Sequence, residues 1–356
     1  GLLSLMPNPD MNSLSVIIPL YNVAPYLETT LDSIARQTLR DFEVILVDDG
    51  STDGTHKIAE HYCLQHPTWQ LISQQCQGVS VARNVGTLQA KGDYVVYVDG
   101  DDWLMPHTLQ SLLDIATLSQ ADLVQCGFFY AYETHLLYDS RRQHPSGEKQ
   151  YFNTENALIA LCQQHPLLNN FLWAKLIRRD IALDCPNPPG KVAQDAFVMH
   201  EIVSRCKKLV TTPQPLWYYR QRSTGLSGHF SVKRKDLLEA YEVRIKFCQQ
   251  THREHLLKEV VPEYIHQIFL HRAAARRSQD KATALVFEQY AQEARKHYAP
   301  LFKTYAPYIW LKSQIKHLSL INFALRAKQR LSPNPMLRYS YSEVIEICAF
   351  SSPSTT

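Results

Sequence analysis

The sequence predicts an α/β domain built on a largely parallel sheet, followed by a mostly α-helical module. From Leu14 onward, short apolar runs alternate with amphipathic segments, the pattern of strands connected by crossover helices. After residue 231 the composition changes to long stretches rich in Gln, Glu, Lys and Arg with few glycines, which favours surface helices. With 356 residues, 45% of them apolar, the chain is long enough for one large domain and an appendage.

The first part of the domain has the most regular alternation. Runs rich in Val, Ile, Leu and Tyr predict strands at 14–20, 42–47, 69–73 and 94–98. A helix that packs on the first strand is predicted by apolar residues at helical spacing, namely Leu27, Leu31, Ile34 and Ala35. A further helix is expected over 79–90.

The rest of the domain alternates less regularly. We expect a helix over 106–118 and a strand over 122–132, then a polar, turn-rich surface excursion over 133–153. Two more helices, 169–182 and 195–205, precede an extended segment at 215–220. In the C-terminal module the helices expected are 232–250, 254–279, 282–298 and 308–330.

The overall net charge of +3 is too small to indicate a nucleic-acid-binding protein. The charge is uneven, however: residues 232–330 carry 19 Lys and Arg against nine Asp and Glu. Basic residues interleaved with apolar ones suit an anionic membrane surface or an acidic partner, and a solvated helical face is the alternative. We therefore expect either peripheral docking on the inner face of a membrane, or helices that form a homodimer or pack on the α/β domain.

Cysteine spacing and hydropathy limit the class of protein. The eight cysteines show no CxxC spacing and no histidine at zinc-site intervals, so neither a disulfide framework nor a zinc site is expected. No run of 18 apolar residues and no secretory leader is recognisable, which favours a cytoplasmic protein. Residues 1–12 are aperiodic and are interpreted as a tail or a cloning remnant.

Two of the predicted strands end in acidic clusters, at the edge where open α/β sheets bind ligands. Asp99 and Asp101 are two residues apart, so an extended backbone would point both carboxylates to one face, and Gly100 between them allows a ligand to approach. Such a pair suits Mg²⁺ or Mn²⁺ shared with a nucleotide diphosphate. Helix capping or turn formation is the alternative for this pair and for Asp48 and Asp49.

Five blocks together narrow these alternatives: SVIIPLYN from Ser15, LDSI…QT from Leu31, FEVILVDDGSTDGT from Phe42, QGVSVARNVG from Gln77 and KGDYVVYVDGDD from Lys91. In order and spacing they resemble the nucleotide-binding half of family 2 glycosyltransferases. The resemblance implies a GT-A fold, a Rossmann-like mixed sheet flanked by helices. It also implies transfer of a sugar from a nucleotide diphosphate donor, here a UDP-sugar, with inversion and a divalent cation.

The resemblance assigns roles to individual residues. Pro19, Tyr21 and Asn22 would hold the nucleoside, Asp48 or Asp49 would contact uracil or ribose, and Arg83 would lie near the ribose and diphosphate. Asp99 and Asp101 would bind the metal, and His229 is a further candidate ligand. The nucleotide-binding half would span 13–105 and the acceptor half 106–231, with the basic helical module over 232–356.

A looser resemblance extends into the acceptor half. Where the family has a Glu-Asp pair, this chain has Gln194 and Asp195, so Asp195 is the expected general base, with His200 and Glu201 as fallbacks and an N-cap role as the alternative. The segment from Trp173 to Arg179 resembles the W-x-K-L stretch that borders the acceptor pocket, and Trp217 to Ser227 resembles a closing YYR segment. The residues expected near the acceptor or diphosphate are Trp173, Lys175, Arg220 and Arg222.

The expected reaction is the transfer of a sugar to a hydroxyl of a glycan or lipid-linked acceptor in cell-surface polysaccharide or lipopolysaccharide synthesis. Gln194 keeps a second reading open, in which a degenerate transferase domain serves as a membrane scaffold. A sugar nucleotidyltransferase is a third, although such enzymes usually carry a glycine-rich loop where this chain has Pro19-Leu20-Tyr21-Asn22. UDP release from UDP-sugars, with and without manganese, separates the three.

Overall fold

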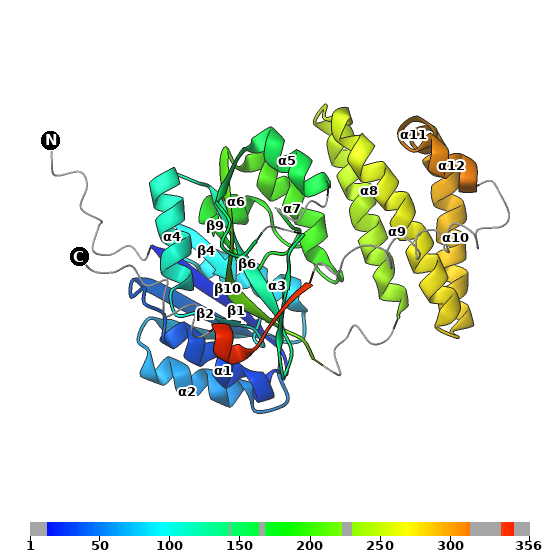
Figure 1. The fold of residues 1–356 in the computed structure, drawn as a ribbon. Coiled ribbons are helices and arrows are strands. Elements are labelled where there is room, and N and C mark those ends of the chain that lie inside the picture. Colours follow the sequence, from blue (N-terminus) through cyan, green and yellow to red (C-terminus); the bar gives the residue numbers. More distant parts are fainter. Residues whose placement is uncertain (1–12, 142–143, 164–167, 223–229, 314–335, 345–356) are drawn as a thin grey trace.

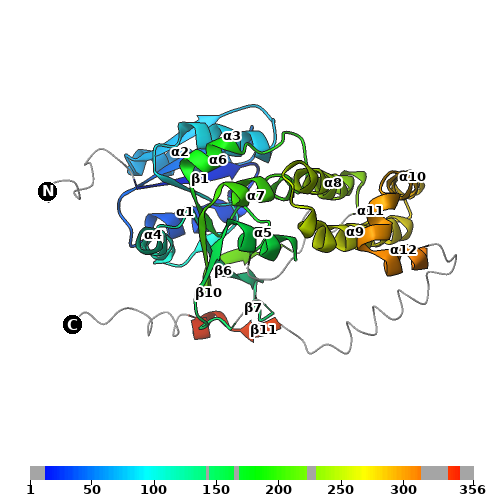
Figure 2. The ribbon, with the colours of Figure 1, turned by 90° about the horizontal axis from the view of Figure 1, so that it is seen from above.

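The computed structural model describes residues 13–141, 144–163, 168–222, 230–313 and 336–344. A mixed sheet with helices on both faces forms the N-terminal domain, and a group of helices lies against one side of it (Figure 1, Figure 2). The expected division into an α/β domain and a helical module is visible in both views.

The parallel part of the sheet is formed by the four strands nearest the N-terminus. Their order is β3-β2-β1-β4, with β1 at Leu14–Leu20, β2 at Phe42–Asp48, β3 at Trp69–Ser73 and β4 at Tyr94–Tyr97. β1 and β2 are buried along their whole length, as continuous apolar runs predict for strands covered on both faces. The four predicted strands are confirmed.

The remaining strands make the sheet mixed. β9 (Lys175–Arg178) runs antiparallel between β4 and β6 (Leu123–Ala131). β10 (Lys208–Arg220) pairs in parallel with β6 and antiparallel with two short strands, β5 (Trp103–Leu104) and β8 (Gln150–Asn153). At the edge, β7 (Leu136–Asp139) is followed by β11 (Met336–Tyr339), a strand supplied by the C-terminal segment.

Helices cover both faces of the sheet and form the C-terminal module. The helices of the α/β domain are α1 (Ala24–Ala35), α2 (Thr55–Gln65), α3 (Val79–Gln89), α4 (Thr108–Ser119), α5 (Thr154–Cys162), α6 (Arg179–Asp184) and α7 (Gln194–Arg205). The helices of the module are α8 (Lys235–Gln250), α9 (Leu257–Arg277), α10 (Lys281–His297), α11 (Ala299–Tyr305) and α12 (Pro307–Ser313), with short 3-10 helices at Val232–Arg234 and Glu254–Leu256.

The apolar core continues from the sheet into the module. One buried cluster joins Ile17 and Ile45 of the sheet to Met199 of α7, Ile245 of α8 and Val261 of α9. A second cluster fills the opposite face of the sheet, under α1 and α4. Of the alternatives left open for the basic helices, the structure thus shows packing on the α/β domain. Among the residues described, no helix combines the length and apolarity needed to cross a membrane.

Two expectations about secondary structure were wrong or incomplete, and a third lies only partly within the described residues. The helix expected over 169–182 is instead strand β9 followed by α6, because Leu176 and Ile177 pair with β6 and β4 inside the sheet. The excursion over 133–153 contains two strands, β7 and β8. The helix expected over 308–330 begins at Pro307, and its residues after 313 lie outside the described part of the chain.

Candidate active site

The two acidic clusters lie at the same edge of the sheet. β1 lies between β2 and β4, Asp48 ends β2, and Asp99 to Asp102 follow β4. The Asp49 backbone N–H donates to the Leu20 carbonyl at 2.8 Å, and a Cβ added to Gly100 would lie 3.0 Å from the Leu20 side chain. The loops after β1, β2 and β4 are therefore packed together at the carboxyl ends of the parallel strands, where ligands bind in open α/β sheets.

Asp48 and Asp49 are both buried and both engaged by the protein. Asp48 accepts from the Ser51 backbone N–H at 3.2 Å and lies 2.9 Å from His56 Nδ1. Asp49 accepts from the backbone N–H groups of residues 77 and 78, at 2.7 and 2.8 Å, and from the side chain of Gln74 at 2.9 Å. Asp49 thus fixes the loop that opens α3, and contact of either carboxylate with a nucleoside stays a prediction.

The loop after β1 presents the residues expected at the nucleoside. Pro19 is buried within β1, whereas the Tyr21 side chain is 55% exposed. Asn22 has a left-handed backbone (φ 48°), and its side-chain oxygen accepts from the Thr52 backbone N–H at 2.8 Å. Asparagine tolerates this conformation better than most residues. Asn22 therefore ties the β1 loop to the β2 loop, and Tyr21 remains accessible.

Arg83 on α3 joins the metal motif to the expected base. Its Nη2 donates to Asp99 Oδ1 at 2.8 Å and its Nη1 to Asp195 Oδ1 at 3.1 Å. Burial opposes the guanidinium charge, but the two carboxylates outweigh it and raise the pKa of Arg83 above its usual value. With the Gln194 amide oriented to donate to the Lys191 carbonyl, its oxygen accepts from Arg83 Nη1 at 3.0 Å. The glutamine at this position is therefore a further partner of Arg83.

Asp101 and Asp102 contact the end of β10 and the segment after it. Arg222 Nη2 lies 2.7 Å from Asp101 Oδ2, and Arg220 Nε donates to the Asp101 carbonyl at 2.7 Å. Asp102 is fully buried and accepts from Trp217 Nε1 at 3.3 Å and from the Arg220 backbone N–H at 3.1 Å. Asp102 therefore fastens the acidic loop to β10, while Asp101 stays partly exposed.

The guanidinium groups of Arg220 and Arg222 are positioned by aromatic rings. Arg220 lies 4.9 Å from the Tyr26 ring and 4.5 Å from the Trp103 ring, and Arg222 lies 4.4 Å from the Tyr26 ring. Such contacts hold a cation over a ring face without neutralising its charge. Two arginines are thus kept beside the acidic loop, where an anion would also meet positive charge.

Asp99 and Asp101 form a donor set that suits a divalent cation completed by the ligand. Their side chains are 30% and 22% exposed. Burial, and next the charge of Asp99, raise the pKa of Asp101, although Arg222 opposes this. A cation would relieve that repulsion. Mg²⁺ and Mn²⁺ sites built from one or two carboxylates leave the other positions to phosphates and water. Among the described residues, no group of three or more His, Cys, Asp or Glu is arranged to hold a metal. His229 lies outside the described residues.

Asp195 lies in the first turn of α7, and its two oxygens accept from different elements. Oδ1 accepts from Arg83 and Oδ2 from the Leu172 backbone N–H at 3.0 Å. No side chain caps α7 at its preceding residue, Ala193, so Asp195 binds across the site instead of capping its own helix. A carboxylate has about four lone-pair positions, and these two bonds leave room for a further proton donor.

The two fallback bases lie elsewhere. His200 is completely buried and its ring packs at a tilt against that of Phe247 of α8, with 4.8 Å between ring centroids. Burial, and next the charge of Arg244, lower the pKa of His200 well below its usual value. Glu201 pairs on the surface with Arg205 at 2.7 Å. Neither side chain lines the cavity that contains Asp195.

The segment resembling W-x-K-L is built into the sheet. Trp173 is nearly buried and stacks on Phe171 and Tyr219, with ring centroids 4.6 and 4.7 Å apart. Lys175 is fully buried, and its ammonium donates to Asn169 Oδ1 at 2.6 Å and to the Phe171 carbonyl. Lys175 is thus a buried residue that fixes the loop before β9, and not a surface residue that faces the acceptor or diphosphate.

A cavity of about 860 Å³ contains Arg83, Asp99 and Asp195. It continues past Phe171 and Trp173 toward the helical module, and its other lining residues include Asn169, Asn170, Leu237, Tyr241 and Gln267. None of these five lining residues was expected from the sequence. Asn169 and Asn170 could have been found, because they are close in sequence to the Trp173 segment. The sequence around the residues of α8 and α9, by contrast, contains no motif that indicates a site.

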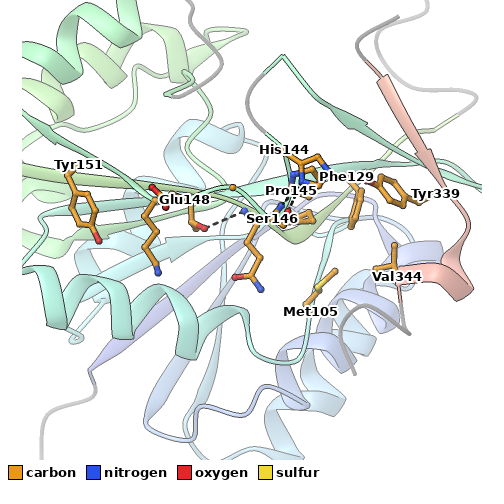
Figure 3. A pocket seen from close by; sticks show the side chains of 14 residues that line it. Met105, Phe129, His144, Pro145, Ser146, Glu148, Tyr151, Tyr339 and Val344 are labelled. Carbon is orange, nitrogen blue, oxygen red and sulfur yellow. Dashed lines mark hydrogen bonds between the residues drawn. The ribbon is translucent and has the colours of Figure 1, made fainter. Parts of the chain in front are cut away.

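A second cavity, of about 650 Å³, lies on another part of the domain (Figure 3). Its apolar side chains include Met105, Phe129, Tyr339 and Val344, and the segment from His144 to Lys149 forms another wall. It contains none of the acids at the strand ends. The first cavity, together with the edge where the acidic loops meet, is therefore the candidate active site.

Comparison with known proteins finds glycosyltransferases. The family model described as glycosyl transferase family 2 matches residues 15–184. The uncharacterized glycosyltransferase EpsJ of Bacillus subtilis is 44% identical over 115 residues, 32% of this chain and 33% of that protein. The cholesterol galactosyltransferase of Borreliella burgdorferi is 31% identical over 231 residues, 63% of this chain and 64% of that protein. The first three curated relatives are thus matched over about a third to two thirds of their length.

Solved structures show the same fold. TarS 1–349 of S. aureus in complex with UDP-GlcNAc superposes with a TM-score of 0.60 at 18% identity, covering 80% of this chain and 92% of that one. The mannosyltransferase PcManGT of Pyrobaculum calidifontis, in complex with GDP-Man and Mn²⁺, gives a TM-score of 0.51 at 20% identity, covering 86% of this chain and 87% of that one. The solved structures show that the fold is GT-A, and the match to the family model shows that residues 15–184 are a glycosyltransferase family 2 domain.

Proposed function

We propose that this protein transfers a sugar from a UDP-sugar to a hydroxyl of a glycan or lipid-linked acceptor, with inversion at the anomeric carbon. The observation that carries the proposal is the arginine bridge: Arg83 holds Asp99 of the metal motif and Asp195 of α7 in one cavity. In this proposal Asp99 is a donor-binding group and Asp195 the proton acceptor, and both are bonded to the same guanidinium. The nucleotide sugars held by TarS and PcManGT support the class of donor.

Asp99 and Asp101 would hold a divalent cation, and Mn²⁺ in PcManGT supports its presence. When bound, such a cation neutralises the charge that develops on the departing diphosphate. Arg222 and Arg220, kept beside Asp101 by aromatic rings, add positive charge on the same side. These two arginines would therefore stabilise the negative charge on the departing nucleotide diphosphate.

Asp195 acts as the general base in this proposal. Arg83 and the Leu172 backbone N–H fix its carboxylate from two sides, so its remaining lone pairs are directed without a reorganisation of the side chain. It would accept the proton of the acceptor hydroxyl as that oxygen attacks the anomeric carbon opposite the leaving diphosphate. No covalent enzyme intermediate is required, since one displacement inverts the configuration.

The test compares two carboxamide variants on the same helix. Asp195→Asn is expected to retain UDP binding, measured by calorimetry with Mn²⁺, and to lower transfer about 10²- to 10⁴-fold. Glu201→Gln, six residues further along α7 and in an exposed ion pair, is the matched control and should keep the wild-type rate. Wild-type transfer by Asp195→Asn would remove Asp195 from the mechanism.

Release of UDP from UDP-sugars also separates the competing functions. A transferase consumes the donor when an acceptor panel is supplied, and EDTA should abolish this if the cation is needed. A non-catalytic scaffold releases no UDP, and a sugar nucleotidyltransferase makes the donor from sugar phosphate and UTP. Peripheral membrane docking, homodimerisation and a role in cell-surface polysaccharide synthesis stay predictions, of which flotation with anionic liposomes tests the first.

A further inference from the structure

The helical module forms one wall of the cavity that contains the expected base. Leu237 and Tyr241 of α8 and Gln267 of α9 line this cavity together with Asp195. At about 860 Å³ it has the size of sites that enclose small ligands, about 300–1,000 Å³. Part of the cavity lining is therefore supplied by residues outside the segment that matches the family model, which ends at residue 184.

Asn169 lines this cavity and carries an amide donor that has no partner within the described part of the chain. Asn169 Oδ1 accepts from the ammonium of buried Lys175 at 2.6 Å and from the Phe171 backbone N–H at 3.1 Å. These two donors fix which side of the amide carries oxygen, so the orientation of the Asn169 NH₂ group is determined. Its Nδ2 is buried and has no hydrogen-bond partner among the residues that the structure describes. A buried donor left in this state is costly unless a ligand accepts from it.

The module also fixes the loops that carry these groups. Arg244 of α8 is buried and donates to Asn170 Oδ1 at 2.5 Å and to the Ala196 carbonyl, next to Asp195, at 3.4 Å. Asp236 of α8 accepts from the Val192 backbone N–H at 2.8 Å. Helix α8 thus contacts the loop beside Asn169 and both sides of the residue expected to be the base.

The lining chemistry favours a neutral, hydroxyl-rich ligand. Carboxamides at 169, 170, 194 and 267 accompany the aromatic residues Phe171, Trp173 and Tyr241. The two cations of the wall are already paired, Arg83 with Asp99 and Asp195, and Arg141 with Asp139. Three carboxylates against two guanidinium groups oppose the entry of a phosphate or uronate group, whereas amides and ring faces suit sugar hydroxyls and C–H groups.

We propose that this cavity is the acceptor site for a neutral saccharide, in which Asn169 Nδ2 donates to an acceptor hydroxyl and Tyr241 and Gln267 of the helical module select the sugar. The proposal rests on the function proposed above and deepens it by naming the acceptor class. The helical module would then determine which glycan end reaches Asp195. Arg83, Asp99 and Asp101 would serve the donor.

The experiment measures steady-state transfer by the full chain from a UDP-sugar that it hydrolyses, to a panel of neutral oligosaccharides and matched oligosaccharides ending in a uronic acid. Asn169→Asp keeps the oxygen that Lys175 and Phe171 bind and removes the donor. It should raise the KM for the neutral acceptor at least about tenfold, that is about 1.4 kcal/mol, with the KM for the UDP-sugar unchanged. Gln267→Ala should raise the acceptor KM and change the preference within the neutral panel.

Leu285→Ala, at an exposed residue of α10, is the control and should match the wild type. Preference for uronic acid acceptors, binding only to lipid vesicles, or unchanged acceptor KM in both cavity variants would overturn the acceptor assignment. In each of these cases UDP uptake and donor hydrolysis would persist. If the wild type neither bound UDP nor hydrolysed the donor, the proposed function itself would be overturned. Failure of the acceptor assignment and failure of the proposed function are therefore distinguishable.

Discussion

Replacement of Arg83 by lysine tests the arrangement on which the site depends. The guanidinium uses two different nitrogens, Nη2 for Asp99 at 2.8 Å and Nη1 for Asp195 at 3.1 Å, and its side chain is only 4% exposed. Lysine keeps the charge but offers one compact ammonium, which lacks the fork geometry of arginine. We therefore expect Arg83→Lys to keep one carboxylate contact and to lose the other.

The expected size follows from the lost contact. A hydrogen bond to a charged group contributes about 1.5–3 kcal/mol, so the free energy of unfolding should fall by about that amount. Activity should fall at least about tenfold, since a base displaced by even an ångström loses its alignment. Urea unfolding, followed by tryptophan fluorescence, gives the free energy from the midpoint and slope of the transition.

Arg205→Lys is the matched control, because Arg205 and Glu201 form an exposed i,i+4 pair at 2.7 Å. Exposed pairs of this kind contribute about 0.3–0.5 kcal/mol, and the control should therefore be close to the wild type. If Arg83→Lys were no less stable than Arg205→Lys and fully active, the bridge between Asp99 and Asp195 would not hold the site together.

Two further predictions concern the fold and its pH dependence. A Cβ at Gly127 would lie 2.4 Å from the Pro213 carbonyl oxygen, so Gly127→Ala should lower the free energy of unfolding by about 1–3 kcal/mol. Gly54→Ala is the control, because a Cβ there would lie 3.8 Å from its nearest neighbour, and it should change the free energy of unfolding little. Urea unfolding of both variants measures the difference. Burial, and next the charge of Arg244, keep the pKa of His200 well below 6.5. The unfolded chain therefore binds a proton that the folded chain does not as pH falls below about 6.5, and the free energy of unfolding should decrease by up to about 1.4 kcal/mol per pH unit. His200→Phe should reduce this slope between about pH 7 and about pH 5, and an unchanged slope would contradict the assignment.

The parallel strands and their acid-tipped ends could be predicted because they depend on local patterns. Continuous apolar runs gave β1, β2 and β4, and the carboxyl ends of parallel strands share an edge whatever the details of the loops. Asp99 and Asp195, by contrast, are 96 positions apart in the sequence, and their common partner Arg83 is visible only once α3 and α7 are packed. The expectation that Asp99 and Asp195 belong to one site came from the resemblance to a family.

Strand β9 shows why part of the site escaped prediction. The stretch from Asn169 to Ala182 has helical periodicity, but antiparallel pairing with β4 and β6 satisfies its backbone inside the sheet. That pairing buries the Lys175 ammonium, which then needs Asn169 as a partner. Whether a charge is buried depends on contacts between residues that are distant in sequence. The local sequence therefore could not predict that the Lys175 ammonium is buried, or which way the Asn169 amide is oriented.

By itself, the sequence determined the class of fold, the strands that carry carboxylates and the separate composition of the C-terminal helices, because periodicity and composition are properties of short segments. Only the tertiary structure decided that these helices pack on the α/β domain and that Tyr241 and Gln267 line the cavity of Asp195. The physical reason is that an amphipathic helix specifies which of its faces is buried, while the partner of that face depends on the shape of the whole folded chain.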